Sequence, residues 1–312
     1  MSQLEALDSG VGTVPVPPVA QLEQQPRRWR RAGILKAAVL SVIVVALSIL
    51  FLYPFVWAVS ASLKPQAEVF DNRLIPKHWA FHNWSDVFHI PDAPMFTWIA
   101  NSLWISTLGA LAVTFSSALI AFGFAYFRFP GRNVLFGLCL ATMMLPQEVT
   151  MIPTYLIWKN LGVINHGGQY PLWVPNLFGS AFYIFLQRQF FLGIPRDYFE
   201  AARMDGDNYF TMFWRIAVPL AKPALIVTFI FEFQAKWFDL LQPLIYLRDT
   251  ALMTLPLGLK TILDSFGQSG GGQGDWQLIV AATVIAVIPM LIIFGVFSKY
   301  FLEGATAQAR KG

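Results

Sequence analysis

Residues 195–207 read PRDYFEAARMDGD, and this polar segment lies between two long apolar stretches of the chain. Asp197 and Glu200 have the spacing of a capping box, in which the first side chain caps a helix and the second reaches back to it. Gly206 is the residue type that ends helices in the left-handed conformation. The pattern predicts a helix of about two turns, which is too short to be stable alone in water. Because it carries apolar and small residues, we expect it to dock into a groove on another molecule.

The composition around this segment is that of a membrane protein. Hydrophobic residues make up 56% and charged residues 13% of the 312 residues, against about 45–50% and about 25% in soluble domains. A spanning helix takes about 20 mostly apolar residues. Six stretches qualify, and they predict an all-α membrane protein with six transmembrane helices: 34–59, 98–125, 133–157 (interrupted by Pro146 and Pro153), 170–192 (with Pro171 and Pro175 in its first turns), 223–247 and 276–298.

Lysine and arginine indicate the orientation, because they are enriched in cytoplasmic loops. With the N-terminus inside, fifteen of the 22 Lys and Arg residues lie inside, six lie outside, and Lys236 falls within a span. Both termini and the loop 193–222 are then cytoplasmic. Residues 1–33 are predicted to be a disordered tail, residues 34–298 the membrane domain, and residues 299–312 a second cytoplasmic tail.

The loop also carries a family pattern. Glu200-Ala201-Ala202, Asp205-Gly206 and Pro219 resemble the EAA loop of ABC importer permeases. The resemblance covers residues 34–312 and is closest in kind to the carbohydrate-uptake branch, in particular to the smaller membrane subunit of maltose-type importers. It rests on these further strings: Asn101-Ser102-Leu103, Phe129-Pro130-Gly131-Arg132, Leu145-Pro146-Gln147-Glu148, Ile152-Pro153, Leu161-Gly162 and Tyr300-Phe301-Leu302-Glu303-Gly304.

The resemblance implies the type I ABC importer permease fold and alternating-access import of a sugar or oligosaccharide through the bacterial plasma membrane. In that family the EAA loop is a coupling helix that sits in a cleft of the ATPase. It implies coupling roles for Glu200, Ala201, Ala202, Asp205, Gly206 and Pro219. The implied partners are a homologous second permease, two ATPase subunits and an extracytoplasmic solute-binding protein.

We expect that the chain itself is not an enzyme and that it binds no cofactor. It contains no Gly-x-x-x-x-Gly-Lys-Ser/Thr phosphate loop, so ATP and Mg would be used by the partner ATPase. We also expect no metal site, although His78 and His82 have a spacing that can bind zinc. Together with His89 they lie in a loop that we expect to be packed by Trp79, Phe81 and Trp84.

The fifth stretch carries three charges. Glu232, Lys236 and Asp239 are spaced i, i+4 and i+7, so on one helix they share a stripe. A charge at the bilayer centre costs about 2.5–3.5 kcal/mol, so this stripe must face protein or water. It is either a translocation pathway, with Trp237 stacking on a sugar ring and Gln242 nearby, or an ion-pair ladder to the partner permease, unless the boundary of this span is misplaced.

Glu148, after Pro146, either lines the same pathway or bonds across helices. Related permeases usually have Trp-Asn and then Trp-Pro-Leu in the fifth stretch. Lys236 departs from this pattern, which suggests the hypothesis of an unusual or partly anionic substrate. The glycine-rich end of loop 248–275 is either a linker or, as the resemblance implies, an element that dips into the binding protein's sugar cleft.

Other functions stay open at this stage. A permease for a phosphorylated polyol such as a glycerophosphate shares the same branch. A membrane-embedded glycosyltransferase would use Glu148, Glu232 or Asp239 as acid or base, and a secondary transporter would use them as proton relays.

Overall fold

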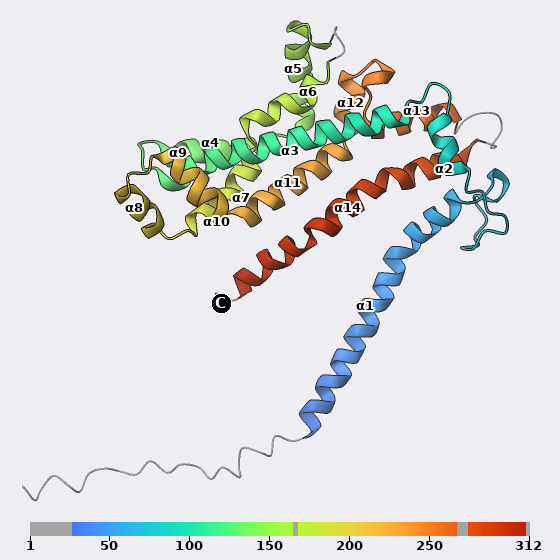
Figure 1. Ribbon diagram of the computed structural model, residues 1–312, viewed down its shortest axis with the longest axis horizontal. Coiled ribbons are helices and arrows are strands. Elements are labelled where there is room, and N and C mark those ends of the chain that lie inside the picture. The colour runs from blue at the N-terminus through green and yellow to red at the C-terminus, as the bar shows by residue number, and fades with distance from the viewer. Residues whose placement is uncertain (1–26, 165–167, 267–273, 310–312) are drawn as a thin grey trace, which may run out of the picture. The chain divides into compact units, whose positions relative to one another are not determined.

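The computed structural model in Figure 1 describes residues 27–164, 168–266 and 274–309, and it places side chains for residues 36–164, 168–265 and 274–297. These residues form helices and turns and no strand, which confirms the all-α class. The helices are α1 (Arg27–Ser62), α2 (Asn83–Asp86), α3 (Met95–Tyr126), α4 (Arg132–Thr142), α5 (Gln147–Asn160), α6 (Tyr170–Trp173), α7 (Ala181–Leu192), α8 (Asp197–Met204), α9 (Tyr209–Met212), α10 (Val218–Leu220), α11 (Lys222–Trp237), α12 (Leu241–Tyr246), α13 (Leu255–Phe266) and α14 (Trp276–Ala309). Short 3₁₀ helices are η2 (Gln66–Glu68), η3 (Val87–His89), η5 (Val174–Phe178) and η7 (Thr250–Leu252), and η6 (Phe213–Ala217) is a π-helical turn.

Three described helices are each long and apolar enough to cross a membrane: Lys36–Ser62, Met95–Tyr126 and Trp276–Phe297. Three bent pairs pass the same test together: Arg132–Thr142 with Gln147–Asn160, Tyr170–Leu192 with Asp197–Met204, and Tyr209–Leu220 with Lys222–Trp237. The described chain therefore has three such helices, or up to six spans if each bent pair counts as one. The predicted count of six is consistent with this arrangement.

Two of the predicted spans are broken near prolines: 133–157, where the sequence indicates an interruption, and 223–247, where it does not. Between α4 and α5 the chain bends by 95°, and α11 ends at Trp237 before α12 begins at Leu241. A proline has no amide hydrogen for the carbonyl four residues earlier, and its ring clashes with that carbonyl. These carbonyls belong to Thr142 for Pro146 and to Asp239 for Pro243. Stretches 133–157 and 223–247 are thus not single straight helices.

The helical ends also differ from the predicted boundaries. α1 begins at Arg27, before the predicted start at residue 34, and α14 continues to Ala309 through most of the predicted C-terminal tail. The predicted disordered segment 1–26 and residues 310–312 lie outside the described residues.

The chain divides into two compact units, Met1–Val56 and Trp57–Gly312. In the second unit α3 is the central helix, packed against α7, α11 and η5. Small residues, among them Ser102, Ser106, Gly109, Ala110, Ser117, Ala118, Ala121 and Ala125, line its buried face. Helices in a bilayer gain little from the hydrophobic effect, so such residues help by letting backbones approach closely.

One buried cluster joins α8 to the bundle. We name it the Phe122 cluster, after the side chain at its centre. Rings of Tyr126, Phe127, Phe191, Phe199 and Phe213 all lie between 5.3 and 6.1 Å from that of Phe122, measured between centroids. Ala125, Ala202, Met212 and Ala217 also belong to it. Because its members come from α3, α7, α8, α9 and η6, the cluster fixes the polar loop 195–217 against the end of α3.

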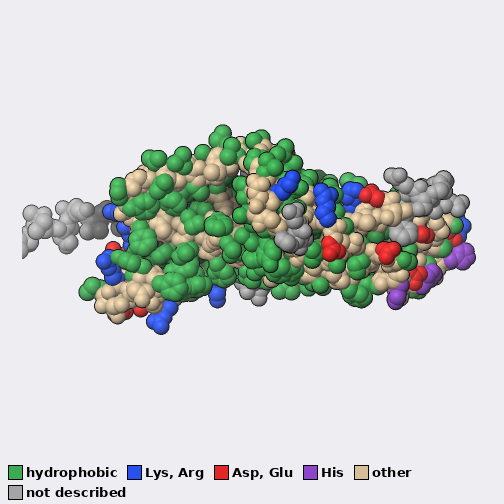
Figure 2. Space-filling model, turned by 90° about the horizontal axis from the view of Figure 1, so that it is seen from above, with side chains coloured by type: hydrophobic (Ala, Val, Ile, Leu, Met, Phe, Trp, Pro, Cys, Tyr) green, Lys and Arg blue, Asp and Glu red, His purple; other side chains and the backbone are tan. Residues whose placement is uncertain are grey.

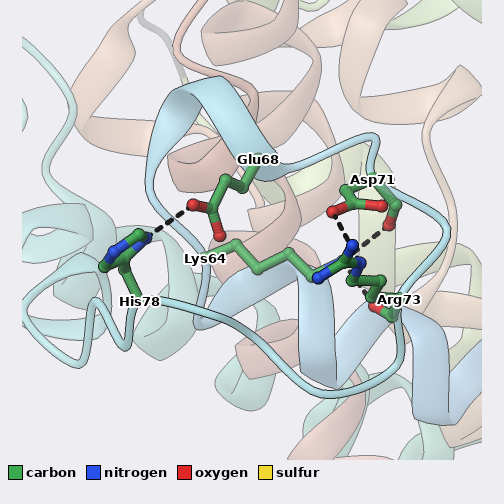
Figure 3. Close-up of polar contacts among 5 residues, drawn as sticks. All are labelled: Lys64, Glu68, Asp71, Arg73 and His78. Carbon is green, nitrogen blue, oxygen red and sulfur yellow. Dashed lines mark hydrogen bonds and ion pairs between the residues drawn. The ribbon is translucent and has the colours of Figure 1, made fainter.

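The loop between α1 and α3 is built around a buried lysine (Figure 3). Lys64 is 1% exposed, and its Nζ donates hydrogen bonds of 2.7 Å to the backbone carbonyls of Asp71 and Arg73. The Asn83 amide donates to the carbonyls of Ser62 and Lys64, at 3.0 and 2.8 Å. The loop is therefore an ordered structure with a satisfied buried cation, since burying an unpaired charge is very costly.

An exposed pair lies in the same loop. His78 Nδ1 and Glu68 Oε1 are 2.7 Å apart, and this hydrogen bond lowers the pKa of the Glu68 carboxyl. Trp79 and Phe81 stack on each other at 5.4 Å but are exposed, so they do not pack the loop as the sequence predicted. Trp84 does, and its Nε1 donates to Ser62 Oγ at 3.1 Å.

Candidate coupling helix and polar pathway

The N-terminus of α8 differs from the predicted capping box. Arg196, not Asp197, is the capping residue, and it makes no side-chain capping bond. Its backbone is already helical, so its carbonyl accepts hydrogen bonds from the amides of Phe199 and Glu200 at 2.9 and 3.0 Å. Asp197 and Glu200 lie in the first turn, where acidic side chains favour the positive end of the helix dipole.

The C-terminus of α8 confirms the predicted glycine stop. Gly206 has a φ of +88°, in the left-handed region. Its amide donates to the Arg203 carbonyl at 3.2 Å, and the Asp207 amide donates to the Ala202 carbonyl at 2.9 Å. These two bonds form a Schellman motif, which satisfies the last carbonyls of the helix.

The two faces of α8 have different environments. Phe199 and Ala202 are 4% and 8% exposed, and the Phe199 ring lies 5.1 Å from that of Tyr126. On the other face Tyr198 and Met204 are 56% and 88% exposed. An eight-residue helix that is anchored on one side and presents bare apolar groups on the other is suited to bind a second protein.

The predicted coupling residues fall on both faces. Glu200, Ala201, Asp205 and Gly206 are exposed, as is Pro219 in α10. Ala202 is buried, so it permits close approach of α8 to its own bundle rather than to another molecule.

Glu232 in α11 is part of a polar network. The Asn176 side-chain amide donates to Glu232 Oε1 and also to the Gly109 carbonyl, at 3.2 Å for the latter. Ser116 Oγ donates to the Asn176 carbonyl at 3.0 Å. Asn176 therefore ties η5 to both α3 and α11. Sequence reasoning missed it, because nothing near position 176 marks it as the partner of a residue 56 positions away.

The predicted stripe of three charges is wrong. Glu232 and Lys236 share α11, but the helix ends before Asp239, whose carboxylate accepts a hydrogen bond of 3.2 Å from the Gln242 amide. Among the described residues, no ion pair within 4.0 Å joins Lys236 to either acid. The Lys236 side chain is half-buried and passes close to Gly109.

Trp237 lies on the other side of α11. It is 1% exposed, its Nε1 donates to the Ala286 carbonyl of α14 at 3.1 Å, and its ring stacks on that of Phe233 at 5.9 Å. In this structure the Trp237 ring is enclosed by protein, so a sugar ring cannot stack on it as predicted. Trp237 is thus a core residue and not a sugar-binding residue in this structure.

A small pocket lies between α5 and α12, and we name it the α5–α12 pocket. Its lining residues are Gln147, Thr150, Met151, Thr154, Leu241, Gln242, Ile245 and Tyr246. Gln242 was predicted as a pathway residue, whereas Glu148 is exposed on α5 and does not line the pocket. Sequence reasoning missed Gln147, Thr150 and Thr154, although their i, i+3, i+7 spacing marks one helix face.

Two predictions concern the loops. Among the described residues, no group of three or more His, Cys, Asp and Glu side chains could hold a metal ion. The predicted role of the glycine-rich loop in the binding protein concerns residues 267–273, which lie outside the described part of the chain.

Comparisons with known proteins agree with this arrangement. Residues 114–304 match the family described as binding-protein-dependent transport system inner membrane component. The chain is 35% identical over 270 residues to the arabinooligosaccharides transport system permease protein AraQ of Bacillus subtilis (strain 168), covering 85% of this chain and 92% of that protein. It is 31% identical to the sn-glycerol-3-phosphate transport system permease protein UgpE of Yersinia enterocolitica, covering 82% and 91%.

A solved structure is similar over nearly the whole chain. It belongs to a bacterial ABC transporter involved in the import of the acidic polysaccharide alginate, with a TM-score of 0.74, 26% identity, and coverage of 88% of this chain and 98% of that one. A second structure, the alginate transporter with a pentasaccharide-bound periplasmic protein, has a TM-score of 0.61 at 16% identity and shows the fold alone.

Proposed function

The chain belongs to the family of binding-protein-dependent transport system inner membrane components, and from that premise we propose how it works as a permease subunit. It forms half of a translocation pathway for a sugar or oligosaccharide, beside a homologous second permease. Two separate ATPase subunits hydrolyse ATP with Mg, and an extracytoplasmic binding protein delivers the substrate. This chain binds no cofactor of its own.

The observation that carries the proposal is the two-faced helix α8. Its outer face, with Tyr198, Ala201 and Met204, occupies a cleft of the ATPase, and Glu200 and Asp205 pair with basic groups there. Its inner face is held by Phe199 in the Phe122 cluster. When the ATPases close, the displaced helix moves the end of α3, and the spans rock to open the pathway to the other side.

A neutral sugar is the favoured substrate class. The α5–α12 pocket offers the amides of Gln147 and Gln242 and the oxygens of Thr150 and Thr154. Amide groups bond well to sugar hydroxyls because each has both donors and an acceptor. The relative named for arabinooligosaccharides supports this class.

An anionic substrate is the second candidate, and Lys236 favours it. Its charge has no ion pair among the described residues, and an intramembrane cation generally marks a substrate or ion pathway. One relative is named for sn-glycerol-3-phosphate and one solved neighbour for an acidic polysaccharide. A phosphorylated polyol or an acidic sugar would place its charge at Lys236.

The proposed orientation puts both termini and α8 in the cytoplasm of a bacterial cell, with the spans in the plasma membrane. It rests on the excess of lysine and arginine on that side.

A membrane-embedded glycosyltransferase is an alternative function of a different class. Such an enzyme has no use for the exposed apolar face of α8, and its acid or base would have to be Glu232, Glu148 or Asp239. Glycosyl transfer by the purified chain alone would favour that enzyme.

The test is to purify the complex that carries a tagged form of this chain and to assay it in proteoliposomes. We expect one type of ATPase and one second permease to co-purify. Glu200→Lys should leave ATP hydrolysis but abolish its coupling to uptake, whereas Asp86→Lys, the same charge change on an exposed residue of the α1–α3 loop, should behave as wild type. Full transport by the Glu200 variant would refute the coupling role.

A further inference from the structure

A basic pocket lies beside α8, and the proposed coupling assigns no role to its arginines. Three arginines line it: Arg128 after the end of α3, Arg196 at the N-terminal cap of α8, and Arg203 on α8. The single carboxylate in the lining is that of Glu200. The pocket therefore has an excess of two positive charges. Figure 2 shows basic side chains at the end of the molecule that carries α8, next to a mostly hydrophobic flank.

The three guanidinium groups are available to a ligand. Within the described part of the chain, no carboxylate lies within 4.0 Å of Arg128, Arg196 or Arg203. The Arg203 guanidinium lies 5.7 Å above the ring of Tyr209, which holds the group in place by a cation–π contact without neutralising it. Guanidinium groups bind phosphate through paired hydrogen bonds.

A second pocket adjoins the first and is apolar. Phe122, Ala125, Phe191, Leu192 and Ile194 line it, and it shares Tyr126, Arg196 and Phe199 with the basic pocket. The two together form one site with a cationic end and a hydrocarbon end. A free phosphate ion would use only the cationic end, so the pair of pockets matches an amphipathic ligand.

The position of the site agrees with such a ligand. α3 is apolar enough to span a membrane and ends at Tyr126, and tyrosine and arginine at the end of a span are typical of the membrane–water boundary. On a helix of 3.6 residues per turn, Arg196, Phe199 and Arg203 lie nearly opposite Tyr198, Ala201 and Met204. These three lining residues thus face away from the side chains that we assign to the ATPase cleft, and Glu200 lies at the border between the two sites.

We propose that these two pockets bind an anionic phospholipid of the leaflet on the α8 side. Its phosphate lies among the three arginines, and the first part of an acyl chain lies against Leu192 and Ile194. The bound lipid connects α8 to the ends of α3 and α7. It thereby gives the coupling region a dependence on the anionic lipid of the membrane.

The experiment titrates phosphatidylglycerol into the complete detergent-purified importer and counts bound lipids by native mass spectrometry, with phosphatidylcholine as the neutral probe. Each basic residue near an anionic membrane surface contributes about fivefold in affinity. Arg128→Gln and Arg196→Gln should each weaken phosphatidylglycerol binding by about that factor and leave phosphatidylcholine unchanged. Lys222→Gln, an exposed cation at the start of α11 that lines neither pocket, should bind as wild type.

Further measurements distinguish a bound lipid from a bound phosphate ion and from an effect on the ATPase. Both arginine variants should retain the ATPase and the second permease, and inorganic phosphate at millimolar concentration should not displace the lipid. The proposal is overturned if the variants bind phosphatidylglycerol normally, if inorganic phosphate displaces it, or if the variants lose only the ATPase. If Arg196→Gln fails to assemble, Arg128→Gln, which lies outside α8, decides the question.

Discussion

Replacing Lys64 by methionine tests whether one buried cation organises the α1–α3 loop. The substitution keeps most of the side-chain volume but removes two hydrogen bonds of 2.7 Å, to the carbonyls of Asp71 and Arg73. A hydrogen bond to a charged group contributes about 1.5–3 kcal/mol, so the two together contribute about 3–6 kcal/mol to the closed loop. The lower figure corresponds to a change of about 150-fold in the opening equilibrium.

The assay is hydrogen exchange of the loop amides in the assembled complex. The amides of Glu68 and Asp71, which bond to the carbonyls of Pro65 and Glu68 at 2.9 and 3.0 Å, should lose most of their protection in Lys64→Met. Lys77 lies in the same loop but is exposed, so Lys77→Met is the matched control and should leave exchange unchanged. Equal protection in both variants would refute the structural role of the buried ammonium group.

Three further predictions concern the proposed coupling and pathway. Phe199→Ala removes a ring that is 4% exposed, at a cost of about 3–5 kcal/mol; it should lower uptake per ATP hydrolysed in proteoliposomes while the ATPase still co-purifies. Gly206→Ala forces a side chain into a φ of +88°, which costs about 1–2 kcal/mol and should speed hydrogen exchange at the end of α8. Gly123→Ala, in α3 with open space at its Cβ position, should not. Lys236→Met should abolish uptake of anionic ligands and spare neutral ones in a competition assay; unchanged preference would exclude Lys236 as a charge-recognition residue.

The sequence predicted best what depends on neighbouring residues. The stop of α8 at Gly206 was predictable because a left-handed turn is a property of one residue and its next amides. The start of α8 was not, because Asp197 has good capping chemistry whether or not Arg196 has already entered the helix. The proline breaks were also visible in principle, since Pro146 and Pro243 each exclude a helical bond four residues earlier.

Polar contacts between residues far apart in the chain could not be predicted from the sequence. Nothing in the sequence marks Lys64 as buried, because the carbonyls that bond to it come from Asp71 and Arg73 and only the fold brings them there. Asp239 was predicted to share a stripe with Glu232 and Lys236 because a continuous helix was assumed. The helix breaks at residues 238–240, so Asp239 lies before the start of α12. The i, i+4 pair Glu232 and Lys236 was placed correctly on one helix, but the partner of Glu232 comes from η5.

The position of α3 gives the proposed coupling a mechanical route. Phe199 on α8 contacts Phe122, and Gly109, which lies thirteen residues earlier on the same helix, accepts a hydrogen bond from Asn176. At 1.5 Å per residue these two points are about 20 Å apart on a continuous helix. Because α3 has no proline between them, a displacement at Phe122 is carried along the helix rather than absorbed in a kink. In the proposed mechanism, a motion of α8 therefore reaches Asn176, and with it Glu232, without direct contact between α8 and these residues.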